Sequence, residues 1–152
     1  MDAFWRLYGT SKPLLSAGSN PAPDTKKVNA KMGMYTTIKA EIVLKDELVP
    51  LIAALHNYEV TWKDILGPCA FVYMDRCSFI PNGGITYSNY PEPLPYKTLE
   101  GNVWKFYCSL KNYSSEIETF WKDVVPLIAE SVTRFESWYE ESDSPTIWVS
   151  PP

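Results

Sequence analysis

The stretch NVWKFYCSLKNYSSEIETFWKDVVPLI, residues 102 to 128, joins the clearest strand pattern of the sequence to its clearest helix pattern. Over residues 102 to 111, apolar and polar side chains alternate with a period of two, which indicates a β-strand with one buried face. The motif Ser115-x-x-Glu118 then predicts a capping box that opens a helix. One side of that helix carries Ile117, Phe120, Trp121, Val124, Val125 and Ile128. The stretch therefore predicts a protein of the α+β class.

A second strand followed by a helix is predicted over residues 36 to 56. Ile38, Ala40, Ile42 and Leu44 alternate with their neighbours, as in a strand with one buried face. Asp46 is then expected to cap a short amphipathic helix that carries Leu48, Leu51, Ile52 and Leu55 at helical spacing. Pro50 is tolerable in this helix because it lies near the first turn.

Shorter segments complete the predicted architecture. Thr61-x-x-Asp64 predicts one or two helical turns that end at Gly67-Pro68. Residues 70 to 74 and 79 to 88 are expected to be strands, the second interrupted by a turn at residues 81 to 84. Residues 89 to 101 predict a long loop, and such loops are more often functional than decorative. Residues 131 to 139 fit a continued helix or a strand; their β-forming residues favour the strand, followed by a turn and a last strand at 146 to 149.

The two halves of the sequence share an order of elements and a pentapeptide. VPLIA occurs at residues 49 to 53 and again at 125 to 129, which leaves an internal duplication open. The order strand, helix, strand, strand, occurring twice, predicts a two-layer sandwich with a mainly antiparallel sheet and two helices on one face. Such an arrangement is expected to leave a groove between the halves, and grooves are common ligand sites.

The composition indicates how the chain is divided into domains and excludes some classes of function. Residues 1 to 31 are rich in Ser, Pro, Gly, Asn and Lys and predict a flexible N-terminal arm, so residues 32 to 152 form a single α+β domain. The net charge of −4 provides no basic surplus for extended nucleic-acid binding. No signal peptide and no apolar run of about 18 residues are present, so a soluble, cytoplasmic protein is expected.

The residues able to carry catalysis or metal binding lack the required patterns. His56 is the only histidine, and its place at a helix end favours a structural role. With Cys69, Cys77 and Cys108 it could form a zinc site, but no Cys-x-x-Cys spacing prearranges the ligands, and free thiols in a reducing compartment are expected instead. Gly83-Gly84 lacks the context of a phosphate-binding loop and indicates a turn.

Carboxylates offer one further catalytic hypothesis. Asp75, at the end of a predicted strand, could act with Glu92 or Glu100 as an acid/base pair, although surface pairing is the commoner fate of such residues. An acidic segment lies in or beside the last turn and comprises Glu136, Glu140, Glu141 and Asp143. We expect it to be a solvated edge that discourages aggregation between sheets; the alternative is that it meets a basic surface of a partner. We therefore expect a non-enzymatic protein without a cofactor or metal.

The candidate binding residues are mainly aromatic. Tyr and Trp side chains anchor interfaces because they supply a large contact area at low entropic cost. The candidates are Trp62, Asp75, Arg76, Tyr87, Tyr90 and Tyr96. The alternative is that the aromatic side chains roof the core.

Several short strings resemble a family of small uncharacterised phage and prophage proteins. They are MYT at 34 to 36, LKNY at 110 to 113 with EIExF at 116 to 120, and YEE at 139 to 141 with PT at 145 to 146. The resemblance covers roughly residues 32 to 149 and implies a phage accessory protein, a group in which many members counter host defence. We expect a protein that binds and inhibits or modulates a host protein, such as an immunity component. The alternative is a protein that sequesters a nucleotide-like small molecule in an aromatic groove.

Overall fold

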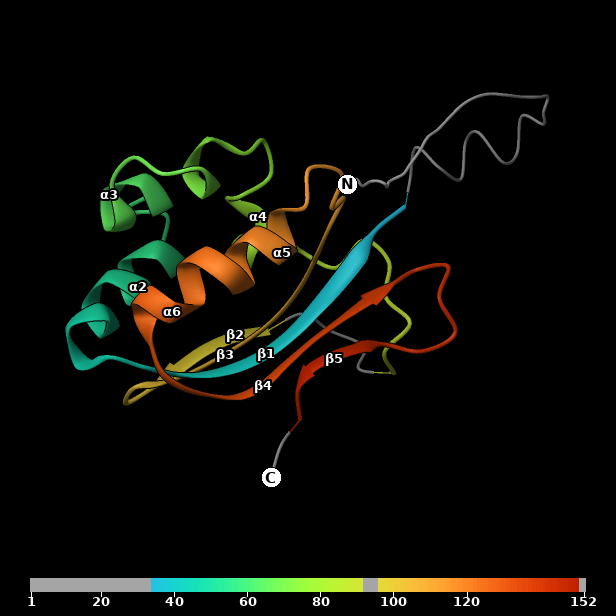
Figure 1. The fold of residues 1–152 in the computed structure, drawn as a ribbon. Helices are drawn as coiled ribbons and strands as arrows, with labels where there is room; N and C mark the ends of the chain where they lie inside the picture. The colour runs from blue at the N-terminus through green and yellow to red at the C-terminus, as the bar shows by residue number, and fades with distance from the viewer. Residues whose placement is uncertain (1–33, 92–95, 151–152) are drawn as a thin grey trace. The chain divides into compact units, whose positions relative to one another are not determined.

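The computed structural model describes residues 34 to 91 and 96 to 150 (Figure 1). The chain divides into two units, Met1–Met34 and Tyr35–Pro152, and every strand and helix described below lies in the second. The expected N-terminal arm at residues 1 to 31 lies outside the described residues. None of the helices described combines the length and the apolar character that crossing a membrane requires.

The second unit is built on one five-stranded antiparallel sheet. Its strands lie in the order β2-β3-β1-β4-β5. Their bounds are β1, Thr36–Leu44; β2, Tyr96–Glu100; β3, Val103–Leu110; β4, Ala129–Tyr139; and β5, Thr146–Val149. The strands predicted at 36 to 44, 102 to 111, 131 to 139 and 146 to 149 are confirmed as β1, β3, β4 and β5.

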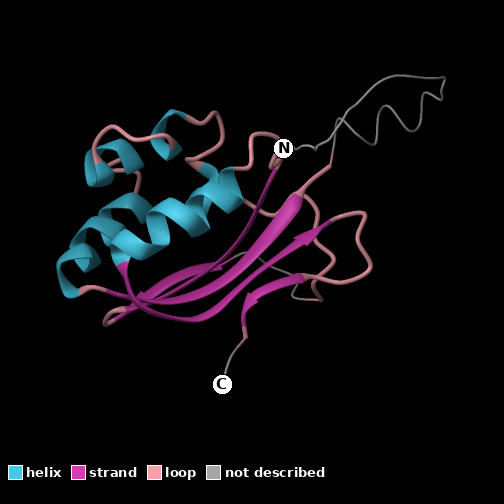
Figure 2. Ribbon diagram, in the orientation of Figure 1, coloured by secondary structure: helices cyan, strands magenta, loops and turns pink. Residues whose placement is uncertain are grey.

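The helices cover one face of this sheet (Figures 1 and 2). From the first half of the unit come the 3₁₀ turn η3, Asp46–Leu48; α2, Val49–His56; α3, Trp62–Leu66; the 3₁₀ turn η4, Phe71–Tyr73; and α4, Phe79–Asn82. From the second half come α5, Glu116–Thr119; the π-helical η5, Phe120–Val124; and α6, Val125–Ile128. The predicted two-layer α+β sandwich is confirmed.

The connections interleave the two halves. β1 pairs antiparallel with both β3 and β4, so each helical connection, from β1 to β2 and from β3 to β4, passes over a strand of the other half. This is the split βαβ, or ferredoxin-like, arrangement, with β5 added beside β4. The first VPLIA repeat begins α2 at Val49, whereas the second lies at the end of the continuous helical segment formed by α5, η5 and α6, which ends at Ile128.

Two strands predicted in the first half are wrong. Residues 71 to 73 and 79 to 82 form the short helical turns η4 and α4, and residues 83 to 88 form neither a strand nor a helix. Phe71 and Ile80 are buried in the helical layer, and the carbonyl of Ile80 accepts a hydrogen bond from the indole of Trp62. Short apolar runs do not distinguish a strand from a buried helical turn, and here packing on Trp62 decides the outcome.

The predicted loop at 89 to 101 contains a strand instead. Tyr96–Glu100 forms β2, which pairs with β3 across the turn at Gly101 and Asn102. Gly101 adopts a φ of 62°, a conformation that glycine tolerates without a steric penalty. A Gly-Asn pair between two strands is a hairpin signal, and the three prolines nearby obscured it.

The helix caps are only partly as predicted. Thr61 and Asp64 form a reciprocal capping box, with the Thr61 N–H donating to Asp64 Oδ2 at 2.8 Å. Asp46 makes no side-chain cap, because it lies inside η3. The capping box at Ser115 is also wrong: Ser115 is left-handed, and Asn112 Oδ1 accepts the Ile117 N–H at 2.9 Å in its place.

Aromatic and aliphatic side chains fill the space between the two layers. The inward faces of β1 and β3 pack against Ile52 and Leu55 of α2 and against Phe120 and Ile128 of the second helix. That helix widens into π geometry at Phe120–Val124, where Pro126 provides no N–H for the carbonyl one turn earlier. The core therefore holds the sheet and both helical connections together. The segment from 57 to 82 adds Trp62, Phe71 and Ile80 to this core and also lines a cavity.

Candidate functional site

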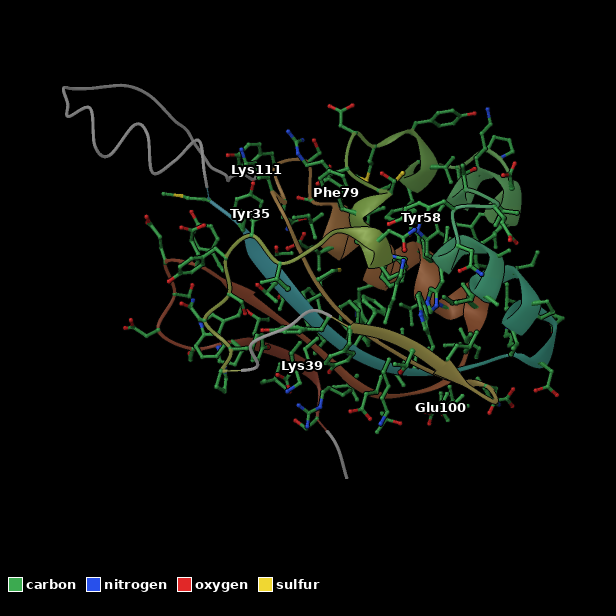
Figure 3. All side chains as sticks on the ribbon, turned by 180° about the vertical axis from the view of Figure 1, so that it is seen from behind. Tyr35, Lys39, Tyr58, Phe79, Glu100 and Lys111 are labelled. Atoms are coloured by element: carbon green, nitrogen blue, oxygen red, sulfur yellow. The ribbon has the colours of Figure 1, made fainter. Side chains whose placement is uncertain are left out.

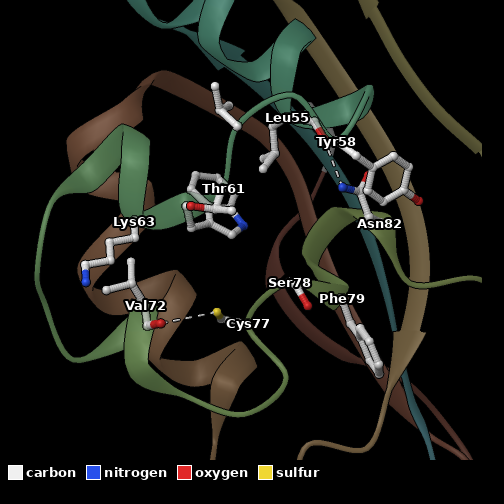
Figure 4. A pocket seen from close by; sticks show the side chains of 11 residues that line it. Leu55, Tyr58, Thr61, Lys63, Val72, Cys77, Ser78, Phe79 and Asn82 are labelled. Atoms are coloured by element: carbon white, nitrogen blue, oxygen red, sulfur yellow. Dashed lines mark hydrogen bonds between the residues drawn. The ribbon is translucent and has the colours of Figure 1, made fainter.

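A cavity of about 640 Å³ opens in the helical layer between α2, α3, η4 and α4 (Figure 4). All of its lining residues lie between Leu55 and Asn82, in the chain between β1 and β2. It therefore does not occupy the predicted groove between the two halves. The apolar lining consists of Leu55, Val60, Trp62, Val72 and Phe79, and hydroxyl, thiol and ammonium groups are confined to a few positions.

Trp62, a predicted binding residue, lines this cavity as a core side chain. It is 2% exposed, and its ring meets the rings of Phe71 and Phe120 edge to face at 5.8 and 5.6 Å. The capping box at Thr61 starts α3 immediately before Trp62 and so fixes the direction of its side chain. Its indole N–H donates to the carbonyl of Ile80 and ties α3 to α4. Trp62 thus supplies a rigid apolar wall.

Exposed aromatic side chains stand at the mouth of the cavity. Tyr58 is 72% exposed and Phe79 is 44% exposed, and both belong to the helical layer (Figure 3). Tyr73, next to the lining residue Val72, is 64% exposed, and the Lys63 ammonium lies 5.3 Å from its ring centre. These three aromatic rings were not among the predicted site residues.

Tyr58 is held in an unusual backbone conformation. Its φ is 62°, in the left-handed region, directly after the C-cap residue Asn57 of α2. Glycine is the usual residue at this position after a helix, so a tyrosine here carries conformational strain. The sequence contained a signal for this exposed ring, because residues 55 to 58 place an aromatic residue just after a helix end, where glycine is common.

A second hollow, of about 230 Å³, adjoins the cavity where β2 begins. Tyr58 and Asn82 line both spaces, and Tyr96 and Lys97 line only the second. The Lys97 ammonium donates to the carbonyl of His56 at 2.8 Å and to Oδ1 of Asn82, and it lies 4.8 Å from the centre of the Tyr58 ring. Of the predicted site residues, Tyr96 alone lies at this hollow.

His56 has the structural role that its position predicted, by a different contact. Its Nε2 accepts the indole N–H of Trp104 at 2.8 Å, and burial followed by the charge of Lys97 lowers its pKa. The imidazole is therefore kept neutral, with one ring nitrogen occupied. Lys97, rather than His56, serves the last carbonyls of α2.

The thiol and carboxyl groups near the cavity are arranged for structure. Cys77 lines the cavity and directs its Sγ to the carbonyl of Val72 at 3.7 Å (Figure 4). Burial, and then the charge of Glu116, raises the pKa of the Cys77 thiol, which keeps it protonated at neutral pH. Glu116 is itself fully buried and accepts the backbone N–H groups of Arg76 and Ser114 at 3.3 and 3.1 Å.

No metal centre is built from the described residues, in which no three His, Cys, Asp or Glu side chains gather closely enough to hold an ion. Cys69, Cys77 and Cys108 are free thiols. Cys108 is buried on the inner face of β3, and burial raises the pKa of its thiol.

Asp75 and Arg76 lie in the loop between η4 and α4, not at the end of a strand. Asp75 is exposed, and the guanidinium of Arg76 lies 5.1 Å from the ring centre of Tyr113. Neither residue lines the cavity. Glu100 ends β2 on the hairpin, and Glu92 lies outside the described residues, so the proposed acid/base pair has no assembled geometry.

The tyrosines of the loop cover the sheet face opposite the helices. Tyr90 meets the rings of Trp138 and Tyr107 edge to face at 4.9 and 5.7 Å, and its O–H donates to Glu136 at 2.9 Å. Burial, and then Glu136, raises the pKa of the Tyr90 phenol. Tyr87 is partly exposed, and its backbone carbonyl accepts a hydrogen bond from Thr37. Tyr90 thus roofs the sheet, as the structural alternative held.

The acidic segment near the last turn is not simply a solvated edge. Glu136 is buried beneath Tyr90 and forms an ion pair with Arg134 at 3.5 Å. Glu140 accepts the Tyr35 N–H at 2.6 Å. The prediction of a solvated edge is wrong for these two residues, because β5 lies outside β4 and the tyrosine loop covers this face. Glu141 and Asp143 are exposed in the turn.

Comparison with known proteins identifies no relative: no protein-family model, no curated protein and no solved structure matches the chain.

Proposed function

We propose that this chain is a non-enzymatic binding protein of the phage accessory type, which binds and inhibits or modulates a protein in the host cytoplasm. The cavity bounded by Trp62 and Phe79 takes up an apolar side chain of that host protein. The observation that carries the proposal is the cavity itself, whose volume of about 640 Å³ lies within the range of established binding pockets.

The mouth of the cavity supports a protein as the partner. Tyr58 and Phe79 line the cavity and present large rings to solvent, and the exposed ring of Tyr73 lies beside the ammonium of the lining residue Lys63. Exposed aromatic surface beside a pocket is typical of interaction sites, where aromatic anchors carry much of the binding energy. In the tyrosine loop, by contrast, Tyr90 is half-buried against the rings of Trp138 and Tyr107.

The chemistry of the polar groups supports binding without catalysis. A protonated Cys77 is a poor nucleophile, and the neutral His56 already accepts a hydrogen bond at Nε2. Nothing among the residues that line the cavity pairs a nucleophile with a base. The site is therefore suited to hold a group rather than to transform it.

A second candidate function is sequestration of a small planar molecule in the same cavity. Its apolar walls and partly enclosed shape favour such a ligand as well. The two candidates differ in a simple measurement: a small ligand at a hundredfold its Kd stabilises the folded protein by about 2.7 kcal/mol. A thermal-shift screen with nucleotides and planar aromatic compounds measures that stabilisation directly.

The proposal is tested by capture from host lysate with a variant that fills the cavity. Val72→Trp places an indole in the cavity, and Leu127→Trp adds the same side chain to an exposed position on α6. We expect the wild type and Leu127→Trp to capture the same host protein and Val72→Trp to lose it, as quantified by mass spectrometry. Equal capture by all three proteins, with Val72→Trp folded by circular dichroism, contradicts the proposal.

A further inference from the structure

Lys97 is a half-buried cation whose hydrogen-bond acceptors are neutral. It projects from β2 toward the helical layer, where its ammonium donates to the backbone carbonyl of His56 and to the side-chain carbonyl of Asn82. The ring of Tyr58 lies 4.8 Å from the same ammonium. These contacts fix the position of the charge without neutralising it.

The charge of Lys97 has no carboxylate within ion-pair distance among the described residues. Arg134, by comparison, pairs with Glu41 and Glu136. An ammonium has three N–H donors, and two acceptors are assigned here. The carbonyl at the end of α2 supplies only the partial negative charge of a helix terminus. Burial, and then the Lys97 charge, lowers the pKa of His56, so this charge acts on a neighbouring group. An anion placed against Lys97 would therefore be stabilised.

The Lys97 hollow adjoins the apolar cavity. Tyr58 and Asn82 line both spaces, and Asn82 joins them by donating to the carbonyl of Leu55 and accepting from the Lys97 ammonium. Tyr58 and Asn82 lie beside each other at one side of the cavity (Figure 4). The exposed Tyr58 ring is free of tight packing and can lie against such a ligand.

We infer that the site recognises an apolar group joined to an anionic group, with the apolar part in the cavity beside Trp62 and the anion bound to the ammonium of Lys97. This inference rests on the proposed function and specifies its ligand: the host protein presents an acidic side chain next to the apolar side chain that enters the cavity. A carboxylate held by a fixed ammonium gains a charge-assisted hydrogen bond in addition to the apolar burial.

Two fluorescent probes separate the apolar and the anionic contributions. Anilinonaphthalene sulfonate carries an aromatic body and an anion, whereas N-phenyl-1-naphthylamine carries nearly the same body without the charge. Lys97→Gln removes the charge and keeps an N–H donor for His56 and Asn82, and Lys97→Arg keeps the charge. Lys105→Gln is the control, because it removes an exposed cation of β3 that lines neither the cavity nor the hollow.

The expected results differ between the probes. The sulfonate binds Lys97→Gln about tenfold more weakly than the wild type, and Lys97→Arg recovers most of that affinity. The neutral probe binds both Lys97 variants within about twofold of the wild type, and Lys105→Gln changes the affinity of neither probe by more than that. Urea unfolding of each variant verifies that the folded state is populated.

The outcomes separate this inference from the proposed function. If neither probe binds saturably, or if Val72→Trp weakens neither, the cavity is not a binding site and both proposals fail. If both probes bind and Val72→Trp excludes them, but Lys97→Gln leaves the sulfonate affinity unchanged, the anion site is wrong and the apolar site stands. If the sulfonate responds to Lys97→Gln while capture of the host protein does not, the acidic side chain of the host protein is ruled out as the source of the anion.

Discussion

The indole N–H of Trp104 donates a hydrogen bond of 2.8 Å to Nε2 of His56, the only histidine of the chain. This contact requires an unprotonated nitrogen, and burial and the Lys97 charge lower the pKa of His56 in the same direction. The histidine therefore links the end of α2 to β3 only in its neutral form. Its titration is a means of testing the described packing.

The first prediction concerns pH and His56. Because the pKa of His56 is lower in the folded than in the unfolded chain, its contribution to stability is fully present above the unfolded value of 6.5. The contribution is lost as the pH falls below 6.5 and through the folded pKa. His56→Gln keeps an acceptor for Trp104 and removes this titration.

Urea denaturation of both proteins, measured at intervals of about one pH unit between pH 8 and pH 5, tests whether His56 is neutral in the folded protein. We expect the wild type to lose more stability than His56→Gln on acidification. Identical pH profiles would contradict a neutral, hydrogen-bonded His56.

The second prediction concerns the buried carboxyl group of Glu116. Its pKa is raised mainly by burial, so its contribution to stability is fully present below the unfolded value of 4.5 and is lost as the pH rises through the folded pKa. Glu116→Gln removes this dependence. Glu116→Ala also leaves the N–H groups of Arg76 and Ser114 without their acceptor, which costs about 1 to 3 kcal/mol.

Chemical denaturation of Glu116→Gln and of the wild type at several pH values measures this dependence. The free energy of unfolding of Glu116→Gln minus that of the wild type should increase as the pH rises above 4.5. A difference that is constant with pH would show that Glu116 does not change its ionisation on folding.

The third prediction separates a roofing role of Tyr90 from a binding role. Tyr90→Phe keeps the ring contacts with Trp138 and Tyr107 and removes the O–H donated to Glu136. We expect a loss of about 1 to 2 kcal/mol in the free energy of unfolding, since Glu136 keeps its ion pair with Arg134. Binding of the neutral probe should be unchanged; weakened binding with unchanged stability would instead place Tyr90 at the binding site.

The fourth prediction uses two neighbouring glycines. A Cβ at Gly83 would lie 2.8 Å from the carbonyl oxygen of Ser109 and 2.9 Å from that of Phe79, whereas a Cβ at Gly84 would meet no atom within 4 Å. Gly83→Ala should therefore destabilise the protein by about 1 to 3 kcal/mol. Gly84→Ala should be neutral or stabilising by up to about 1 kcal/mol.

Thermal unfolding of the two alanine variants provides the comparison, with each acting as the other's control. Equal changes in Tm would mean that β3 does not approach the chain at Gly83 as described. A lower Tm for Gly83→Ala alone would support the close packing of Gly83 against Ser109 at the smaller hollow.

The sequence predicted the central layers because their patterns are local. The alternation at 36 to 44 and at 102 to 111 each belongs to one strand, and the helical spacing at 117 to 128 belongs to one continuous helical segment; all three are confirmed. The segment from 67 to 91 was predicted less well, because its short apolar runs take their conformation from packing against Trp62 and Phe120. That packing depends on contacts distant in sequence, which no local period encodes.

The sequence predicted that the candidate site contains aromatic residues, but it predicted their positions only in part. Trp62 lines the cavity and Tyr96 the adjoining hollow, whereas Tyr90 covers the other face of the sheet. Lys97 was not singled out, because a lysine in a predicted loop carries no pattern of its own. Its place beside α2 follows from the pairing of β2 with β3, a relationship that only the fold reveals.

The most direct test of the central claim is a crystal structure of the protein with 4-bromo-1-naphthoic acid, located by the anomalous scattering of its bromine. The account predicts a bromine peak inside the cavity between Trp62 and Phe79, with the carboxylate within hydrogen-bond distance of the Lys97 ammonium. A bound acid whose bromine lies outside this cavity, or a cavity that stays empty at saturating concentrations, would contradict the account.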